Sequence, residues 1–147
     1  MIALKIENIK EFMIRLFQEN MFDKFHVNHC EVTTFVTFST DGKVNASWFS
    51  DEEEEIGRLI AWQRLKPVIF SFIRGKKTPG KLQIDFCHYM ADGDMGSLRV
   101  QYDENGLFLY TGYMQCDFVP GHEKQLEWDE NCISFIKKNG IVSTQLD

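Results

Sequence analysis

The sequence predicts an α+β protein, with an antiparallel sheet of about four or five strands and three or four helices packed on one of its faces. Two observations predict this class. Helical and strand patterns stand in separate blocks, whereas a doubly wound fold would alternate them. In addition, residues 81–118 contain runs that alternate apolar and polar side chains between turn sequences, which is the pattern of an antiparallel meander.

The composition limits the kind of protein. A chain of 147 residues with 44% hydrophobic residues predicts a single globular domain, residues 1–147. The net charge of −6 and the pI near 5.2 disfavour bulk electrostatic binding to nucleic acid or anionic membranes. No apolar run is long enough to cross a bilayer, and the first residues do not resemble a signal peptide. We therefore expect a cytoplasmic protein whose four cysteines, which form no C-x-x-C motif, are free thiols.

The first part of the chain predicts a helix followed by a long strand. Residues 9–19 carry apolar side chains at helical spacing, and Asn8 is placed to cap that helix. Residues 25–39 are rich in Thr, Val and Phe and contain no Gly or Pro, which predicts one strand. The side chains expected on its common face are Cys30, Val32, Thr34, Val36 and Phe38. Residues 40–43 then predict a turn and a short return strand through Val44.

Two further helices are predicted before the meander. Ser50 and the acidic run 51–55 are typical of a helix start, because carboxylates favour the positive end of the helix dipole. The apolar stripe of this helix would be Ile56, Leu59 and Ile60. Pro67 fits the first turn of the next helix, 68–74, which is apolar on nearly all sides and is therefore expected to be buried. Gly75 stands where a C-terminal cap belongs.

The meander is predicted as three strands, at 81–90, 98–103 and 107–118. The loop ADGDMG, residues 91–96, is explained as a turn rich in Asp and Gly. It fails as a calcium loop, because Ser97 stands where a glycine is required and the flanks are strands. A last helix is predicted at 129–138 with Asp129 as its cap. The side chains expected to face inward from it are Cys132, Ile133 and Ile136.

Five short segments together resemble one family. They are MIALKI at the start, IRGKKTP at 73–79, LYTG at 109–112, LEWD at 126–129 and FIKKNGI at 135–141. The chain resembles a family of small uncharacterised proteins from Gram-positive anaerobes that is known only as a domain of unknown function. The resemblance extends over nearly the whole chain and implies a single-domain bacterial protein. It implies no activity, ligand or catalytic residue.

The segment IRGKKTPGK, residues 73–81, is the first candidate binding site. No acidic residue lies between Arg58 and Lys81, so basic side chains gather there in an otherwise acidic chain. An anion site for phosphate or a nucleic-acid backbone would be built from Arg74, Lys76, Lys77, Thr78 and Lys81. The alternative is structural, since cations near the end of a helix stabilise it. A P-loop is excluded because the helix precedes the glycine rather than following it.

Two adjacent pairs, His29-Cys30 and Cys87-His88, are the candidates for metal binding or catalysis. Neighbours on a strand point to opposite faces, so each pair offers one ligand to any one site, whereas zinc takes four. Cys30 with His88 and a third group is the arrangement that stays open. His88 stands on the apolar face of its predicted strand, where a core or rim histidine is expected. We therefore predict no metal and no cofactor.

Two classes of function remain. The first, which we favour, is a non-catalytic binding or interaction module that uses the outer sheet face and the basic segment 74–81. Its partner would be a protein or an anionic ligand; nucleic acid is allowed but not favoured, and no membrane is expected. The alternative is a small cytoplasmic enzyme, with a site that tertiary contacts assemble from His29, His88 or Cys87.

Overall fold

The computed structural model describes residues 1–48, 58–73, 75, 77–117 and 120–146. Within these ranges no helix is long and apolar enough to span a membrane. The elements follow in the order β1 (Ala3–Ile6), α1 (Ile9–Phe17), β2 (His26–Thr33), β3 (Thr37–Thr40), the 3₁₀ helix η1 (Ala46–Trp48), α2 (Trp62–Ile73), β4 (Lys81–Tyr89), β5 (Met95–Asp103), β6 (Gly106–Met114), α3 (Glu123–Lys138) and β7 (Ser143–Leu146).

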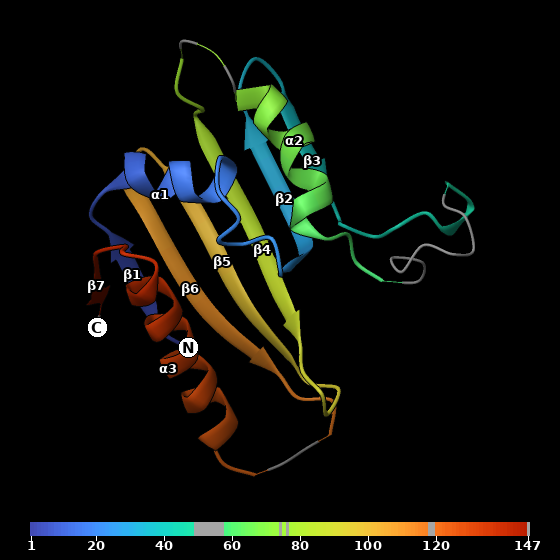
Figure 1. Ribbon diagram of the computed structural model, residues 1–147, viewed down its shortest axis with the longest axis vertical. Helices are drawn as coiled ribbons and strands as arrows, with labels where there is room; N and C mark the ends of the chain where they lie inside the picture. The colour runs from blue at the N-terminus through green and yellow to red at the C-terminus, as the bar shows by residue number, and fades with distance from the viewer. Residues whose placement is uncertain (49–57, 74, 76, 118–119, 147) are drawn as a thin grey trace.

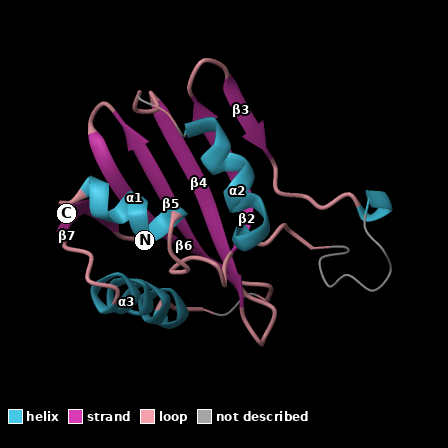
Figure 2. Cartoon of the chain, turned by 45° about the horizontal axis from the view of Figure 1, so that its top comes forward, coloured by secondary structure: helices cyan, strands magenta, loops and turns pink. Residues whose placement is uncertain are grey.

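The strands form one seven-stranded sheet in the order β3-β2-β4-β5-β6-β1-β7, and every neighbouring pair runs antiparallel. Figures 1 and 2 show α1, α2 and α3 on the same face of this sheet. We call the other face, which carries none of these three helices, the open face. The predicted α+β class is confirmed. The sheet is larger than the predicted four or five strands, because the short strands β1, β3 and β7 extend its two edges.

The predicted meander is confirmed by β4, β5 and β6, which pair one after another. Its second turn is held by Asp103, whose carboxylate accepts a hydrogen bond from the Asn105 N–H at 2.8 Å. Gly106 follows with a φ of 124°, a conformation that favours glycine. The third strand ends at Met114, earlier than predicted, and Phe118 lies outside the described residues.

The single strand predicted for residues 25–39 is wrong. The chain folds back between β2 and β3, where the Thr34 N–H donates to the Val36 carbonyl at 2.9 Å. Thr34 and Val36 therefore lie in a turn and not on the apolar face. Folding back brings Phe38 against Phe72 of α2, with the ring centroids 4.8 Å apart, so an apolar residue at the sheet edge is covered. A continuous strand over residues 25–39 would have extended beyond the end of β4, the nine-residue strand with which β2 pairs.

The turn predicted after β3 does not start a return strand. Lys43 instead forms an isolated bridge with Leu59, and the Ile60 N–H donates to the Gly42 carbonyl at 2.8 Å. These bonds hold Leu59 and Ile60 extended, which contradicts their place in the predicted helix stripe. The rest of that helix, including the acidic run, falls in residues 49–57, outside the described residues.

α2 begins at Trp62, earlier than the predicted start at Pro67. The Trp62 indole is fully buried, and its Nε1–H donates to the Leu16 carbonyl at 3.2 Å, which ties the first turn of α2 to α1. Pro67 lies inside the helix, where it has no N–H to donate to the carbonyl of Gln63, a residue that is exposed to water. Val68 is 47% exposed, so the helix is not buried on all sides as predicted.

α1 begins as predicted, with the Asn8 side chain accepting a hydrogen bond from the Glu11 N–H at 3.0 Å. α3 begins at Glu123, nearly two turns before the predicted start at Asp129. Asp129, expected as its cap, is instead buried inside the helix, where it accepts a hydrogen bond from the Thr111 hydroxyl at 2.5 Å. A buried carboxylate is tolerated there because Thr111 bonds it, and the N-terminal ammonium group lies 3.5 Å away.

Aromatic rings dominate the core between the sheet and the helices. Phe22, from the segment after α1, is fully buried and stacks on Phe86 of β4 with centroids 4.8 Å apart. The same ring meets Phe12 of α1 edge-on at 5.7 Å and Phe135 of α3 at 5.6 Å. Phe22 therefore joins the sheet and two helices in one apolar cluster.

Replacing Phe22 by alanine should lower the free energy of unfolding by about 3–5 kcal/mol, because a buried aromatic side chain is lost and a cavity remains. Urea unfolding followed by circular dichroism measures this. Phe35→Ala is the control: that ring is 85% exposed, and its loss should change the free energy by about 0.5 kcal/mol or less. If the two variants were equally stable, the core would have been misplaced.

Candidate ligand-binding site

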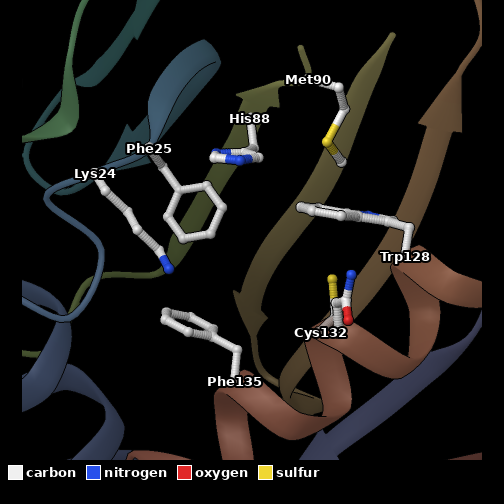
Figure 3. A pocket seen from close by; sticks show the side chains of 8 residues that line it. Lys24, Phe25, His88, Met90, Trp128, Cys132 and Phe135 are labelled. Carbon is white, nitrogen blue, oxygen red and sulfur yellow. The ribbon is translucent and has the colours of Figure 1, made fainter. Parts of the chain in front are cut away.

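A cavity of about 220 Å³ opens between α3, the end of β4 and the segment that precedes β2. Figure 3 shows its side chains gathered around a common space. Apolar walls with a few polar groups are the usual lining of a small-molecule site. We call this cavity the aromatic pocket; it is lined by Lys24, Phe25, His88, Met90, Trp128, Asn131, Cys132 and Phe135.

α3 supplies half of this lining from one face. The four residues follow one another at helical spacing and are Trp128, Asn131, Cys132 and Phe135. The sequence-based prediction began the helix at Asp129, which separated Trp128 from the rest of the face. A capping signal farther upstream would have revealed the full face, but His122, at the observed cap position, makes no side-chain capping bond.

The Trp128 indole is a fixed wall of the pocket. Its Nε1–H donates to the Ser97 carbonyl of β5 at 2.9 Å, and the residue is only 6% exposed. Gly96 makes space for the ring, because a Cβ at this position would lie 2.5 Å from the indole. The wall is therefore in place before any ligand binds, which lowers the entropic cost of binding.

His88 projects from the helix-facing side of β4 and lies nearly parallel to the Trp128 indole, with the centroids 6.0 Å apart and the planes 9° apart. Phe25 packs against the same imidazole edge-on at 6.0 Å. Burial, together with the positive charge of Lys24, lowers the pKa of His88 below its ordinary value, so the imidazole is neutral at neutral pH. Neither ring nitrogen has a hydrogen-bond partner in the described part of the chain, which leaves both available to a ligand.

Lys24 places a positive charge beside the aromatic walls. Its Nζ lies 4.8 Å from the ring centroid of Phe135 and 5.7 Å from that of Phe25. Such cation–π contacts hold an ammonium group near ring faces without neutralising its charge. Because Lys24 forms no ion pair with any residue that the structure describes, this charge is available to an anion.

A neighbouring cavity of about 280 Å³ adjoins the aromatic pocket. The two share Met90, Trp128 and Asn131, so the indole stands between them. The neighbouring cavity is also lined by Asp92 and Lys124, which form an ion pair at 3.2 Å. The surface is therefore mainly apolar on the side of the Trp128 ring that faces the aromatic pocket and charged on the side that faces the neighbouring cavity.

Asp94 anchors this charged end and is 1% exposed. Its carboxylate accepts hydrogen bonds from the Tyr113 hydroxyl at 2.6 Å, the Cys116 N–H at 2.9 Å and the Lys124 ammonium at 3.1 Å. These bonds, the one from Tyr113 above all, hold the pKa of Asp94 well below its usual range. Loss of water contact and the bond to Asp94 raise the pKa of Tyr113 to about 12. The network ties the β4–β5 turn to β6 and α3, the elements that flank the pocket.

The described residues of the predicted anion site fall into two places. Lys81 begins β4 and forms an ion pair with Glu31 of the adjacent strand at 3.3 Å. Lys77 and Thr78 line a different cavity, between α1 and α2. Outside the described residues are Arg74 and Lys76.

The structure separates the two histidine–cysteine pairs. His29 and Cys87 lie on the open face of the sheet, whereas Cys30 and His88 lie on the helix face. Cys30 pairs with Ile84, which is four residues from His88 along β4, a distance of about 13 Å. The Cys30–His88 arrangement that the sequence left open is therefore too wide for a shared metal ion. Among the described residues no group of three His, Cys, Asp or Glu side chains could hold a metal.

The four thiols are all weakly acidic. Burial raises the pKa of Cys30 and Cys132 to about 12 and that of Cys87 to about 11. The exposed Cys116 also has a raised pKa, chiefly because its thiol bonds to Asp94. Since the thiolate is the reactive form, these side chains are poor nucleophiles at neutral pH.

Residues 15–93, more than half of the chain, match Family of unknown function (DUF5721). The matched segment extends from α1 to the β4–β5 turn and includes Lys24 and His88. This match confirms the resemblance to a domain of unknown function over these residues, whereas the bacterial source stays a prediction. No curated protein and no solved structure matches the chain. The description of the family names no activity, so any function has to be argued from the site.

Replacing Gly96 by alanine should displace the Trp128 indole and lower the free energy of unfolding by about 1–3 kcal/mol, as overpacking does. The added methyl group would meet the ring at 2.5 Å. Urea unfolding and the tryptophan emission spectrum measure both effects. Gly80→Ala is the control, because its nearest neighbour would lie 3.9 Å away. A Gly96→Ala variant as stable as this control would show that the indole does not pack on β5.

The pH dependence of stability should report on Asp94. Because its pKa is lowered in the folded state, the ionised carboxylate stabilises the fold above about pH 4, and this contribution is lost as the pH falls further, through the folded pKa. We expect Asp94→Asn to lower Tm at neutral pH and to flatten the decline of Tm in acid.

Thermal melts of the parent protein and two variants test this expectation. Glu104→Gln, which removes an exposed carboxylate in the β5–β6 turn, should reproduce the parent profile. A decline in acid that is equally steep in Asp94→Asn would contradict the role assigned to the Asp94 network.

Proposed function

The chain belongs to this family of unknown function, and we propose that it is a non-catalytic binding protein whose aromatic pocket takes a small planar anion, such as an aromatic carboxylate. One observation carries the proposal. The Lys24 ammonium group, which has no carboxylate partner among the described residues, lies 4.8 Å from the face of Phe135 in a pocket walled by aromatic rings. A ligand in this pocket thus meets a positive charge and aromatic ring faces at the same place.

The aromatic walls favour a flat ligand body. Trp128 and His88 offer nearly parallel rings, while Phe25 and Phe135 meet each other edge-on at 5.5 Å. A planar ligand ring that enters this cavity loses its contact with water and gains contact with the faces and edges of these aromatic side chains. Aromatic pairs in such geometry gain about 0.5–1.5 kcal/mol beyond the burial of their area.

The polar groups favour a negative charge on that ligand. Among the described lining residues Lys24 is the charged one, and no carboxylate faces the cavity. The Asn131 amide and the neutral His88 imidazole each carry an N–H group that donates a hydrogen bond to a carboxylate oxygen. Hydrogen bonds to an ionised group are about twice as strong as those between neutral groups.

Catalysis receives less support from the same site. The Cys132 thiol in the lining has a pKa raised to about 12 by burial, so little thiolate exists to attack a substrate. The observation that favours the alternative, a small enzyme, is that His88 is neutral and its ring nitrogens have no hydrogen-bond partner among the described residues, so it has the form of a general base. No described carboxylate orients its ring, as the base of a catalytic triad requires. We therefore place binding first.

The test is a titration with benzoate, benzamide and benzylamine, followed by calorimetry and tryptophan fluorescence at neutral pH. The three probes share a ring and differ in charge, so benzoate should bind most tightly and benzylamine most weakly. Lys24→Met keeps the apolar stem and should weaken benzoate binding about five- to tenfold without affecting benzamide. Lys5→Met, at an exposed position on β1, is the matched control.

Acid should strengthen benzoate binding. The pKa of His88 is lowered in the free protein by burial and by the charge of Lys24, so its imidazole becomes charged only when the pH falls below that lowered pKa, and it then adds a second cation to the site. His88→Gln should remove this pH dependence, and benzamide should show none in either protein. The proposal fails if benzoate and benzylamine bind alike, or if benzoate binding ignores Lys24→Met.

A further inference from the structure

A second cavity, of about 390 Å³, lies between α1 and α2 over the other end of β4. Its floor contains Leu82 of β4 and Tyr102 of β5, which are paired. Leu82 lies near the start of β4, whereas His88, which lines the aromatic pocket, lies near its end. Figures 1 and 2 show α1 and α2 next to each other above this end of the sheet. We call this cavity the helix groove.

The interior of the helix groove is apolar. Met13 of α1 and Ile73 of α2 are among the side chains that line it. Phe17 and Phe70 meet with their ring centroids 5.7 Å apart and join the two helices across it. Together with the floor, these side chains give the helix groove a mainly apolar lining.

The charged side chains that line the helix groove are both cations. Lys10 and Lys77 are exposed, and the exposed hydroxyl of Thr78 stands beside Lys77 in sequence. No acidic side chain is among the described lining residues, and neither ammonium group has an ion-pair partner in the described ranges. By contrast, Lys66 and Lys81 are paired with carboxylates at 2.7 and 3.3 Å. A chain with a net charge of −6 thus places two lysines, without ion-pair partners among the described residues, at one apolar groove.

We propose that the helix groove binds an alkyl carboxylate, a ligand of the fatty-acid class. The alkyl chain lies along the apolar interior, where each methylene removed from water adds to affinity. The carboxylate faces Lys10, Lys77 and Thr78, whose ammonium and hydroxyl groups donate hydrogen bonds to it. This site is separate from the aromatic pocket, and either proposal stands or fails alone.

A nucleic-acid backbone fits the same observations less well. Binding along a phosphate backbone uses a row of cations. Lys81, which the sequence grouped with Lys77, lies on the open face of the sheet and is paired with Glu31. A nucleic acid would also leave the apolar interior of the groove unused, whereas an alkyl carboxylate uses both that interior and the cations at its rim.

The experiment compares decanoate with decyltrimethylammonium, two amphiphiles of similar chain length and opposite charge, below the concentrations at which they form micelles. Equilibrium dialysis and calorimetry measure binding to the full chain. We expect saturable binding of decanoate at one site per chain, and binding of the cation that is weaker by about tenfold or more.

The double variant Lys10→Glu/Lys77→Glu should weaken decanoate binding by about tenfold or more, since reversed charges repel the carboxylate. Lys5→Glu/Lys43→Glu reverses two exposed lysines away from the groove and is the matched control, which should bind decanoate like the parent protein. Both variants should keep the parent circular dichroism spectrum and the parent affinity for benzoate, which separates this test from that of the aromatic pocket.

Four results would overturn the proposal. The first is equal affinity for the two amphiphiles, which would show simple hydrophobic adsorption. The second is decanoate binding that persists in Lys10→Glu/Lys77→Glu, and the third is the absence of decanoate binding in the parent protein. The fourth is binding to vesicles of phosphatidylglycerol without binding of free decanoate, which would assign the groove to a membrane surface instead.

Discussion

The structure depends on one constraint: a single face of the sheet carries α1, α2 and α3. At about 3.3 Å per residue and about 4.8 Å between strands, the seven strands present roughly 740 Å² of face. The helices have a combined length of about 55 Å and a width of about 10 Å, so they cover roughly 550 Å². The apolar surface that they leave has to be covered by loops or stay open as cavities.

The chain covers part of that remaining surface with the segment after α1. Phe22 and Phe25 fill the space between α1, α3 and β4, and Phe22 is fully buried there. What is left at the end of β4 is bounded by Phe25, Trp128 and Phe135 and forms the aromatic pocket. At the other end the helix groove remains, where Phe17 and Phe70 hold two helices together without closing the space between them. Both candidate sites are thus consequences of how three short helices cover one wide face.

The polar residues of each site owe their role to their neighbours. Lys24 follows Phe22 and Asp23 in a segment without helix or strand periodicity, and nothing local marks it as a ligand-binding cation. Only the return of α3 places the Phe135 ring 4.8 Å from its ammonium group. The basic segment 73–81, in contrast, was visible in the sequence, but the register of β4 turns Lys81 to the open face and away from Lys77.

The sequence by itself determined the α+β class, the β4–β5–β6 meander and the start of α1 at Asn8, because turn chemistry, strand alternation and helix capping act over a few residues. It did not determine β1 and β7, whose four-residue strands carry too little periodicity and are held by partners far along the chain: Ala3 pairs with Tyr110 and Leu146. Nor did it determine the start of α3, where no capping bond marks the first turn. The tertiary structure alone decided that Trp128 would pack on Gly96 and form a pocket wall, since side chains distant in sequence meet only when the whole face is assembled.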